Sequence, residues 1–255
     1  MTFLQQFGDA QRFFQYDYIY IDALFLIIWI FFLIKNKKEK ALIFSIIIAP
    51  IIYSIDAMIW WNTSAGPGFS VGTFIREYWI GGVQMPHPLG EFFWIKFGAD
   101  FMMTISYAIF AFSWIWIMFE SIRKKVIDNS SIIKYTSVYF IMWILVPLLS
   151  YLVPINDIPV VSVRHMSSQI TSMVMSVVVG YLLLIMVYRK ELFTVFRVFL
   201  VGVSASLIME IPLHIFGIRP TGILFVLFEA LLLLNIGTPY LFLLWDKLLY
   251  PHYKK

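Results

Sequence analysis

The chain lacks cysteine and has few charged residues. Of its 255 residues none is cysteine and 13% are charged, whereas 61% are hydrophobic. Soluble domains carry about 25% charged residues. The composition therefore excludes an ordinary soluble fold and indicates a polytopic membrane protein. The lack of cysteine excludes a disulfide framework, a thiolate nucleophile and a cysteine metal site.

Other common sequence signals are missing as well. The first 16 residues contain no continuous apolar core, so we expect no cleavable signal peptide and interpret them as a short interfacial segment. Neither HxxxH nor HExxH occurs, so the usual helical zinc motifs are absent from the sequence. Retinal-binding membrane proteins attach retinal to a lysine in the middle of their last helix. The last predicted helix here has no such lysine, because Lys247 falls at its end, so the sequence does not indicate a retinal protein.

Long apolar runs, in contrast, are abundant. A run of about 20 apolar residues spans the hydrocarbon core of a bilayer as a helix. Seven such runs predict an all-α integral membrane protein, a seven-transmembrane-helix bundle that forms a single domain over residues 1–255. The predicted helices are approximately 17–35, 41–61, 92–119, 132–153, 165–188, 192–216 and 221–245.

The basic residues predict the orientation of the bundle. Fourteen of the 19 lie in four short stretches that a seven-helix alternation places on one side of the membrane. Because positive loops stay in the cytoplasm, we expect the N-terminus outside and the C-terminus inside. The loop at about 62–91 then lies outside, and its aromatic residues favour a structured cap. We expect the protein in the cell (cytoplasmic) membrane.

Ionisable residues recur in the outer halves of the predicted helices. A carboxylate in hydrocarbon costs about 2.5 kcal/mol or more on insertion scales, so each needs a partner or a wet cavity. Their similar depth predicts one polar cavity that opens outward. One helical stripe starts with small residues and ends with ionisable ones; it consists of Gly202, Ser206, Glu210 and His214.

Acid/base catalysis on a lipid or isoprenoid substrate is the leading functional hypothesis, in the manner of a cyclase, hydratase or isomerase. A desolvated carboxyl group can deliver a proton, and a second carboxylate can stabilise a cation or remove a proton. We expect Glu210 to be the proton donor or base and His214 to relay the proton. The partner carboxylates are expected to be Asp56, Asp100 and Glu229.

The same hypothesis assigns residues to substrate binding. Arginines near the outer mouth are expected to hold an anionic or polar end of the substrate, and aromatic faces to stabilise a carbocation. The arginines are Arg76, Arg164 and Arg219; His165 lies beside them; the aromatic residues are Trp60, Trp61 and Tyr107.

Two alternatives remain open at this point. The same carboxylates and histidines also suit a proton-coupled carrier or a ligand-binding membrane protein. A metal-dependent lipid hydrolase would use His87, His165 and His214, with Glu210 or an aspartate, as zinc ligands. We expect no cofactor and no nucleic-acid partner. The substrate, the reaction type and the oligomeric state are open.

Overall fold

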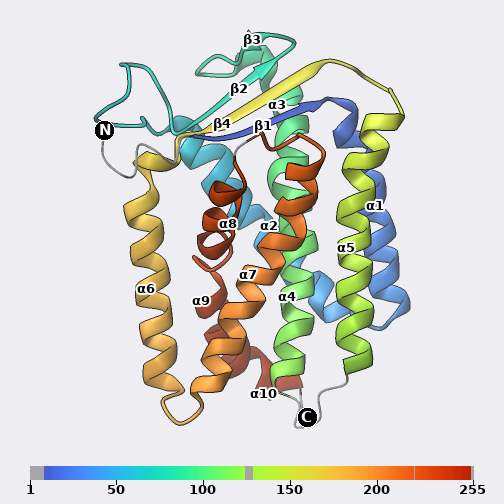
Figure 1. The fold of residues 1–255 in the computed structure, drawn as a ribbon, viewed down its shortest axis with the longest axis vertical. Helices are drawn as coiled ribbons and strands as arrows, with labels where there is room; N and C mark the ends of the chain where they lie inside the picture. The colour runs from blue at the N-terminus through green and yellow to red at the C-terminus, as the bar shows by residue number, and fades with distance from the viewer. Residues whose placement is uncertain (1–8, 124–128, 221, 254–255) are drawn as a thin grey trace.

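The structure is a bundle of helices with a small β-sheet across one end (Figure 1). It is a computed structural model that describes residues 9–123, 129–220 and 222–253. Within these residues six helices are long and apolar enough to cross a membrane, as a membrane bundle requires. They are Asp17–Lys35, Glu39–Asn62, Gly90–Arg123, Asn129–Leu152, Ile170–Val187 and Leu192–Ile215.

Two of these six helices contain a π-helical segment. α2 (Glu39–Tyr53) runs on into the π segment Ser54–Ile59. The π segment Phe101–Ser106 joins α3 (Phe93–Asp100) to α4 (Tyr107–Arg123). The remaining four long helices are α1 (Asp17–Lys35), α5 (Asn129–Leu152), α6 (Ile170–Val187) and α7 (Leu192–Ile215).

The region predicted as a seventh helix, 221–245, is interrupted. It contains α8 (Ile223–Leu232) and α9 (Thr238–Leu244), with non-helical turns at 233–237 between them. A π segment, Trp245–Leu249, and the short α10 (Tyr250–Tyr253) follow. The sequence places Gly237 before Pro239 here, and both residues disfavour a continuous helix. Ten residues of α8 rise only about 15 Å, so α8 alone is too short to span a bilayer.

The sheet was not anticipated from the sequence. It has four antiparallel strands in the order β1 (Ala10–Gln15), β4 (Pro159–Arg164), β2 (Arg76–Ile80) and β3 (Val83–Gln84). β1 lies in the segment interpreted as interfacial, and β2 and β3 lie in the long loop after α2. β4 also corrects a boundary, because the predicted helix 165–188 begins only at Ile170.

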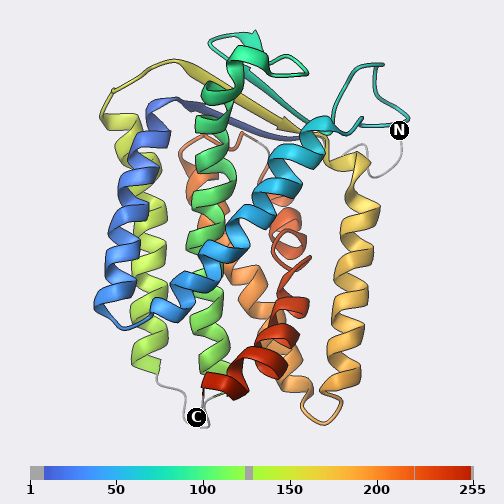
Figure 2. The same ribbon diagram turned by 180° about the vertical axis from the view of Figure 1, so that it is seen from behind.

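α4 and the segment that precedes it form the centre of the bundle. In the membrane window of Gly90–Arg123, 89% of the residues are buried, compared with 22% in α6. α2 and α7 both pack against α4, and Figure 2 shows α2 crossing it obliquely. The low burial of α6 leaves most of its apolar side chains facing outward, which suits contact with lipid.

Glycines allow close packing around the interrupted region. A Cβ atom on Gly202 would lie 2.1 Å from Oδ1 of Asn235, and one on Gly180 would lie 2.5 Å from Pro239. Small residues let membrane helices approach in this way. The small end of the Gly202 stripe is therefore a packing surface, which holds α7 against the turns at 233–237.

Basic residues gather at the end of the bundle opposite the sheet. The turn from α1 to α2 and the turn from α6 to α7 both lie there (Figure 1). Ion pairs tie this end together: Lys38 pairs with Glu120, and Arg123 binds Asp246 at 2.6 Å and Glu191 at 3.0 Å. The two ends of the bundle thus differ in both fold and charge.

Candidate functional site

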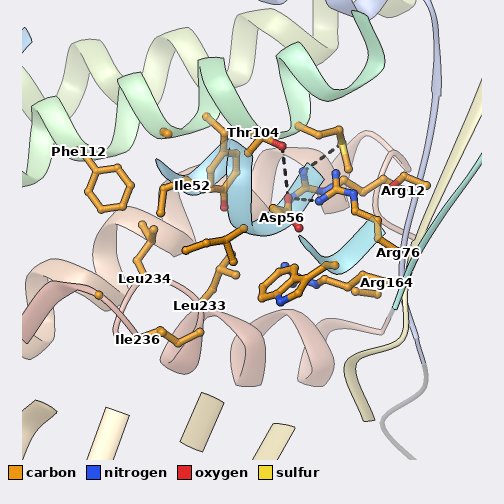
Figure 3. Close-up of a pocket in the computed structure, with 18 of the residues that line it drawn as sticks. Arg12, Ile52, Asp56, Arg76, Thr104, Phe112, Arg164, Leu233, Leu234 and Ile236 are labelled. Carbon is orange, nitrogen blue, oxygen red and sulfur yellow. Dashed lines mark hydrogen bonds and ion pairs between the residues drawn. The ribbon is translucent and has the colours of Figure 1, made fainter. Parts of the chain in front are cut away.

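A cavity of about 280 Å³ lies beneath the sheet (Figure 3). Its polar end is lined by Arg12, Arg76 and Arg164 from the sheet. Its other end is apolar and reaches Phe112 on α4 and Leu233 beside the helix interruption. The remaining lining residues are Ala10, Ile52, Ile55, Asp56, Trp60, Met103, Thr104, Tyr107, Ala108, Ser162, Arg219, Leu234, Ile236 and Gly237.

Three breaks in regular helix meet at this cavity. The π segment Ser54–Ile59 contributes Asp56, the π segment Phe101–Ser106 contributes Thr104, and the turns at 233–237 contribute four lining residues. π segments are rare and occur frequently at functional sites. Irregular backbone at membrane depth is tolerated where it is buried in protein or lines a cavity. The convergence marks the cavity as the candidate site.

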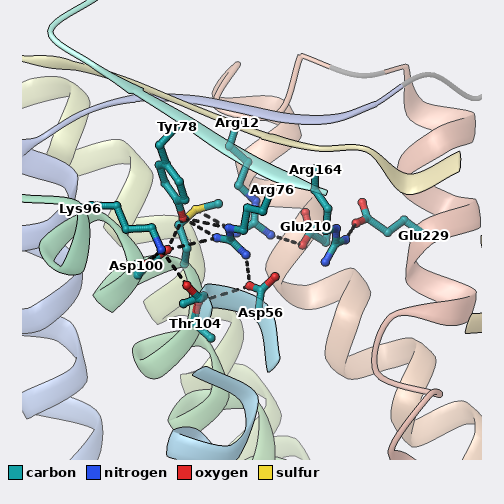
Figure 4. Close-up of polar contacts among 12 residues, drawn as sticks. Arg12, Asp56, Arg76, Tyr78, Lys96, Asp100, Thr104, Arg164, Glu210 and Glu229 are labelled. Carbon is teal, nitrogen blue, oxygen red and sulfur yellow. Dashed lines mark hydrogen bonds and ion pairs between the residues drawn. The ribbon is translucent and has the colours of Figure 1, made fainter. Parts of the chain in front are cut away.

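A chain of alternating charges connects the sheet to the helices, and Figure 4 shows its two outer pairs, Arg12 with Glu210 and Arg164 with Glu229. Arg12 binds Glu210 at 2.7 Å; Glu210 binds Arg219 at 2.9 Å; Arg219 binds Glu229; and Glu229 binds Arg164. Both glutamates are fully buried and Arg219 is 2% exposed. Burying a charged side chain costs free energy unless an opposite charge pairs with it. These ion pairs therefore compensate glutamates and arginines that would be too costly to bury on a single helix. We call these five residues the arginine–glutamate chain.

A second ionic group lies next to this chain. Arg76 pairs with Asp56 and lies 3.7 Å from Asp100, which also pairs with Lys96. The hydroxyl of Tyr78 donates to Asp100 at 2.5 Å. Each carboxylate in this group thus has a cationic partner, and Figure 4 shows the whole set beneath the strands.

The strand register explains why three arginines meet here. β1 pairs with β4 and places Arg12 opposite Ser162, whereas β2 pairs with β4 and places Arg76 opposite Arg164. Side chains two residues apart share one face of a strand, so Arg164 and Ser162 face the same side. Arg12, Arg76 and Arg164 therefore occupy one face of three adjacent strands, the face that covers the cavity.

All five basic residues outside the four basic stretches belong to this site. They are Arg12, Arg76, Lys96, Arg164 and Arg219. Arg12 and Lys96 were missed as site residues. A signal for Lys96 was present, since Lys96 and Asp100 are four residues apart and pair on one helix face. Arg12 had a weaker signal, namely that it is a basic residue on the side where the orientation rule expects few.

The predicted carboxylates do come together, but with different surroundings. Asp56 lines the cavity, whereas Glu210, Asp100 and Glu229 lie behind the lining in ion pairs. Both oxygens of Glu210 are occupied: Oε1 accepts from Arg12 and from the hydroxyl of Tyr107, each at 2.7 Å, and Oε2 pairs with Arg219. This geometry suits a structural carboxylate better than the proton donor or base expected from the sequence.

Of the three predicted aromatic residues, two line the cavity and one does not. Trp60 lines the cavity, with the guanidinium of Arg164 5.5 Å from its ring centroid. Tyr107 lines it as well. Trp61 does not line the cavity; it is buried, stacks on His87 at 3.9 Å and covers the ammonium of Lys96 at 4.4 Å.

The histidines occupy three separate environments. His214 lies 3.1 Å from the backbone oxygen of Arg219, so it supports the loop that carries this arginine. His165 contacts Asp9 at 2.9 Å and Glu77 at 3.1 Å, and His87 lies between the rings of Trp61 and Phe74. In the described part of the chain no three residues of the types His, Cys, Asp and Glu group as metal ligands.

Burial lowers the pKa of the two arginines outside the membrane helices that share Glu229. The pKa of Arg219 falls to about 10, and that of Arg164 also falls to about 10, with the positive charge of Arg12 adding to the effect of burial. Both guanidinium groups still carry a full charge at neutral pH. The arginines of the sheet side thus stay charged and keep their ion pairs at neutral pH.

We expect Glu210→Gln to destabilise the protein. The change leaves Arg12 and Arg219 without their shared carboxylate, and loss of one partner of a buried ion pair costs about 3–5 kcal/mol. The measurement is the thermal unfolding midpoint in detergent. Glu120→Gln is the matched control, because the Lys38–Glu120 pair is partly exposed and contributes at most about 1 kcal/mol. Equal midpoints for the two variants would contradict a stabilising role for the arginine–glutamate chain.

We also expect stability to fall as pH rises through the titration of His165. Burial lowers the pKa of this imidazole, but hydrogen bonds to Asp9 and Glu77 outweigh burial and raise the pKa above its ordinary value. The stabilisation is thus complete below about pH 6.5, the unfolded value, and is lost as pH passes the folded value. Unfolding midpoints between pH 6 and 9 should decline in the wild type and decline less in His165→Gln. If the unfolding midpoints of wild type and His165→Gln declined equally with pH, His165 would not be the group responsible.

The chain was also compared with known proteins. No protein-family model matches it, and neither the curated proteins nor the solved structures yield a significant match. We therefore infer function from the geometry of the cavity and of the ion pairs around it.

Proposed function

We propose that the chain is a membrane-embedded enzyme that performs acid/base chemistry on a lipid or isoprenoid bound in the cavity. The observation that carries the proposal is the position of Asp56. Its Oδ2 pairs with Arg76 and accepts from the hydroxyl of Thr104 at 3.3 Å, whereas its Oδ1 has no hydrogen-bond partner in the part of the chain that the structure describes. Among the predicted catalytic carboxylates, Asp56 is the one in the cavity lining.

The role that fits Asp56 is general base. Its pairing with Arg76 is that of a carboxylate, and Arg76 and Thr104 fix its orientation through one oxygen only. We assign the other oxygen, which has no hydrogen-bond partner among the described residues, to take a proton from a bound substrate, as general-base catalysis requires. Trp60 lies in the same lining, and its ring face suits a developing positive charge. The chemistry that balances with this one group is isomerisation of an apolar substrate, in which Asp56 removes a proton from one carbon and the protonated carboxyl group then returns it to another.

The proposal includes the membrane orientation. We place the sheet and the segment 62–91 outside the cell, the basic end in the cytoplasm, and α8 and α9 together as a seventh, interrupted crossing. The basic turns at the end opposite the sheet support this orientation (Figure 1). In this orientation β2 and β3 belong to the cap expected over the cavity.

Asp56→Asn tests the catalytic role. We expect it to reduce turnover about 10²–10⁴-fold, the usual contribution of a general base. Membranes of cells that express wild type, Asp56→Asn or the control Glu120→Gln would be extracted, and their lipids compared by chromatography and mass spectrometry. A lipid that changes in retention or mass with wild type and with the control, but not with Asp56→Asn, supports the proposal. A lipid change that Asp56→Asn retains would refute it.

A proton-coupled carrier is a second candidate because of the helix interruption. Discontinuous helices are a common feature of transporter binding sites, and the turns at 233–237 line the cavity. The two candidates differ in a measurable way. Proteoliposomes containing a carrier should take up ligand under a pH gradient and lose this uptake with Asp56→Asn. Lipid conversion without uptake would reject the carrier.

A further inference from the structure

We propose that Arg12 and Arg164 together bind one oxyanion, a phosphate or carboxylate, that is the head group of the amphiphile in the cavity. The apolar tail then lies along Phe112, Leu233 and Leu234 at the other end. This inference rests on the proposed function, because it names the substrate class of the same cavity. It replaces Arg219 by Arg12 among the residues expected to hold the substrate.

The order of charges in the arginine–glutamate chain points to these two residues. The chain reads Arg12, Glu210, Arg219, Glu229, Arg164, so it has three cations, two anions and an arginine at each end. Arg219 has a carboxylate on both sides, with its Nε 2.9 Å from Glu210 and its Nη2 paired with Glu229. Each terminal arginine lines the cavity and has a carboxylate on one side only. An oxyanion between the two ends would balance the excess positive charge.

The sheet brings the two arginines close enough to share a ligand. Arg12 is opposite Ser162, and Arg164 is two residues further along the same strand and on the same face. Diagonal neighbours of this kind are about 7–8 Å apart at the backbone, within the reach of long side chains. Ser162 also lines the cavity, directly opposite Arg12 and two residues from Arg164 on the same strand. Guanidinium groups suit phosphate and carboxylate because they can donate two parallel hydrogen bonds.

Like charges on neighbouring strands are destabilising unless an anion compensates them. Arg164 faces Arg76 directly and has Arg12 on its other side. Asp56 and Asp100 compensate Arg76, as described above. Glu210 and Glu229 compensate two of the three charges of Arg12, Arg164 and Arg219, so one positive charge remains, and an oxyanion that contacts Arg12 and Arg164 balances it.

The size and polarity of the cavity favour an amphiphile over a small free anion. A volume of about 280 Å³ is close to the lower limit of small-molecule sites, about 300 Å³. The arginines lie at one end, and the side chains of Phe112, Leu233, Leu234 and Ile236 lie at the other (Figure 3). A free phosphate would leave this apolar end without a ligand.

Binding to the purified full-length protein in phosphatidylcholine nanodiscs tests the inference. The probes are dodecyl phosphate, dodecanoate, dodecanol and inorganic phosphate, and the readouts are dissociation constants and the thermal unfolding midpoint. We expect dodecyl phosphate or dodecanoate to bind at least about tenfold more tightly than dodecanol, because hydrogen bonds to charged groups are strong. Equal affinity of the three dodecyl probes would overturn the inference. Competition by inorganic phosphate at equal concentration would also overturn it, in favour of a free anion.

Variants connect the binding to the two arginines. Arg164→Gln should abolish the preference for the anionic probes, whereas Lys38→Gln, a basic residue paired at the opposite end, should not change it. Ser162→Val keeps both arginines and places a bulkier apolar side chain in the cavity lining beside them, so it should also remove the preference if Arg164→Gln does not fold. A preference that survives in Ser162→Val would overturn the inference.

These measurements are independent of turnover. If the anionic preference is found while Asp56→Asn retains lipid conversion, the head-group site stands and the catalytic role fails. If lipid conversion depends on Asp56 while the dodecyl probes bind equally, the enzyme stands and the head-group site fails.

Discussion

Neutralisation of buried charge is the constraint on which the rest of the structure depends. Glu210 and Glu229 lie on two different helices with no exposed surface, and neither could remain there ionised without a cation. Arg219 bridges them, and Arg12 and Arg164 complete the chain from above. The ion pairs therefore decide how the end of α7, the loop after it and α8 sit beneath the sheet.

The sheet serves as the source of these cations. Helices that cross lipid seldom carry arginine, whereas a strand at the end of the bundle can point every second side chain inward. Arg12, Arg76 and Arg164 use this alternation, and each reaches down to a helix-borne carboxylate. The antiparallel pairing of the strands fixes the spacing of these three arginines more precisely than flexible loops would. The result is a row of ion-paired arginines above a mostly apolar cavity.

The sequence predicted the membrane helices because runs of apolar residues are a local signal. It also predicted that the carboxylates of several helices meet, since a buried carboxylate must have partners. It could not predict the sheet: β1 has only six residues, AQRFFQ, which include the charged Arg12 and two glutamines, and its partner β4 lies far along the chain. Arg12 was missed for this reason. The sequence also could not separate Asp56, the proposed base, from Glu210, a structural carboxylate. That difference depends on which carboxylate oxygens accept hydrogen bonds, and only the structure shows this.

The pair formed by Lys96 and Asp100 has a consequence for biogenesis. The helix that carries both residues is the most buried of the six long helices, and two of the helices packed against it, α5 and α7, follow it in the chain and are therefore synthesised later. Arg76 and Asp56, the other members of that ionic group, come from different segments. Lys96 and Asp100 are one helical turn apart and bind each other within a single helix. The segment can thus enter the bilayer with its two charges already mutually neutralised, and exchange part of that pairing for Arg76 when the bundle closes.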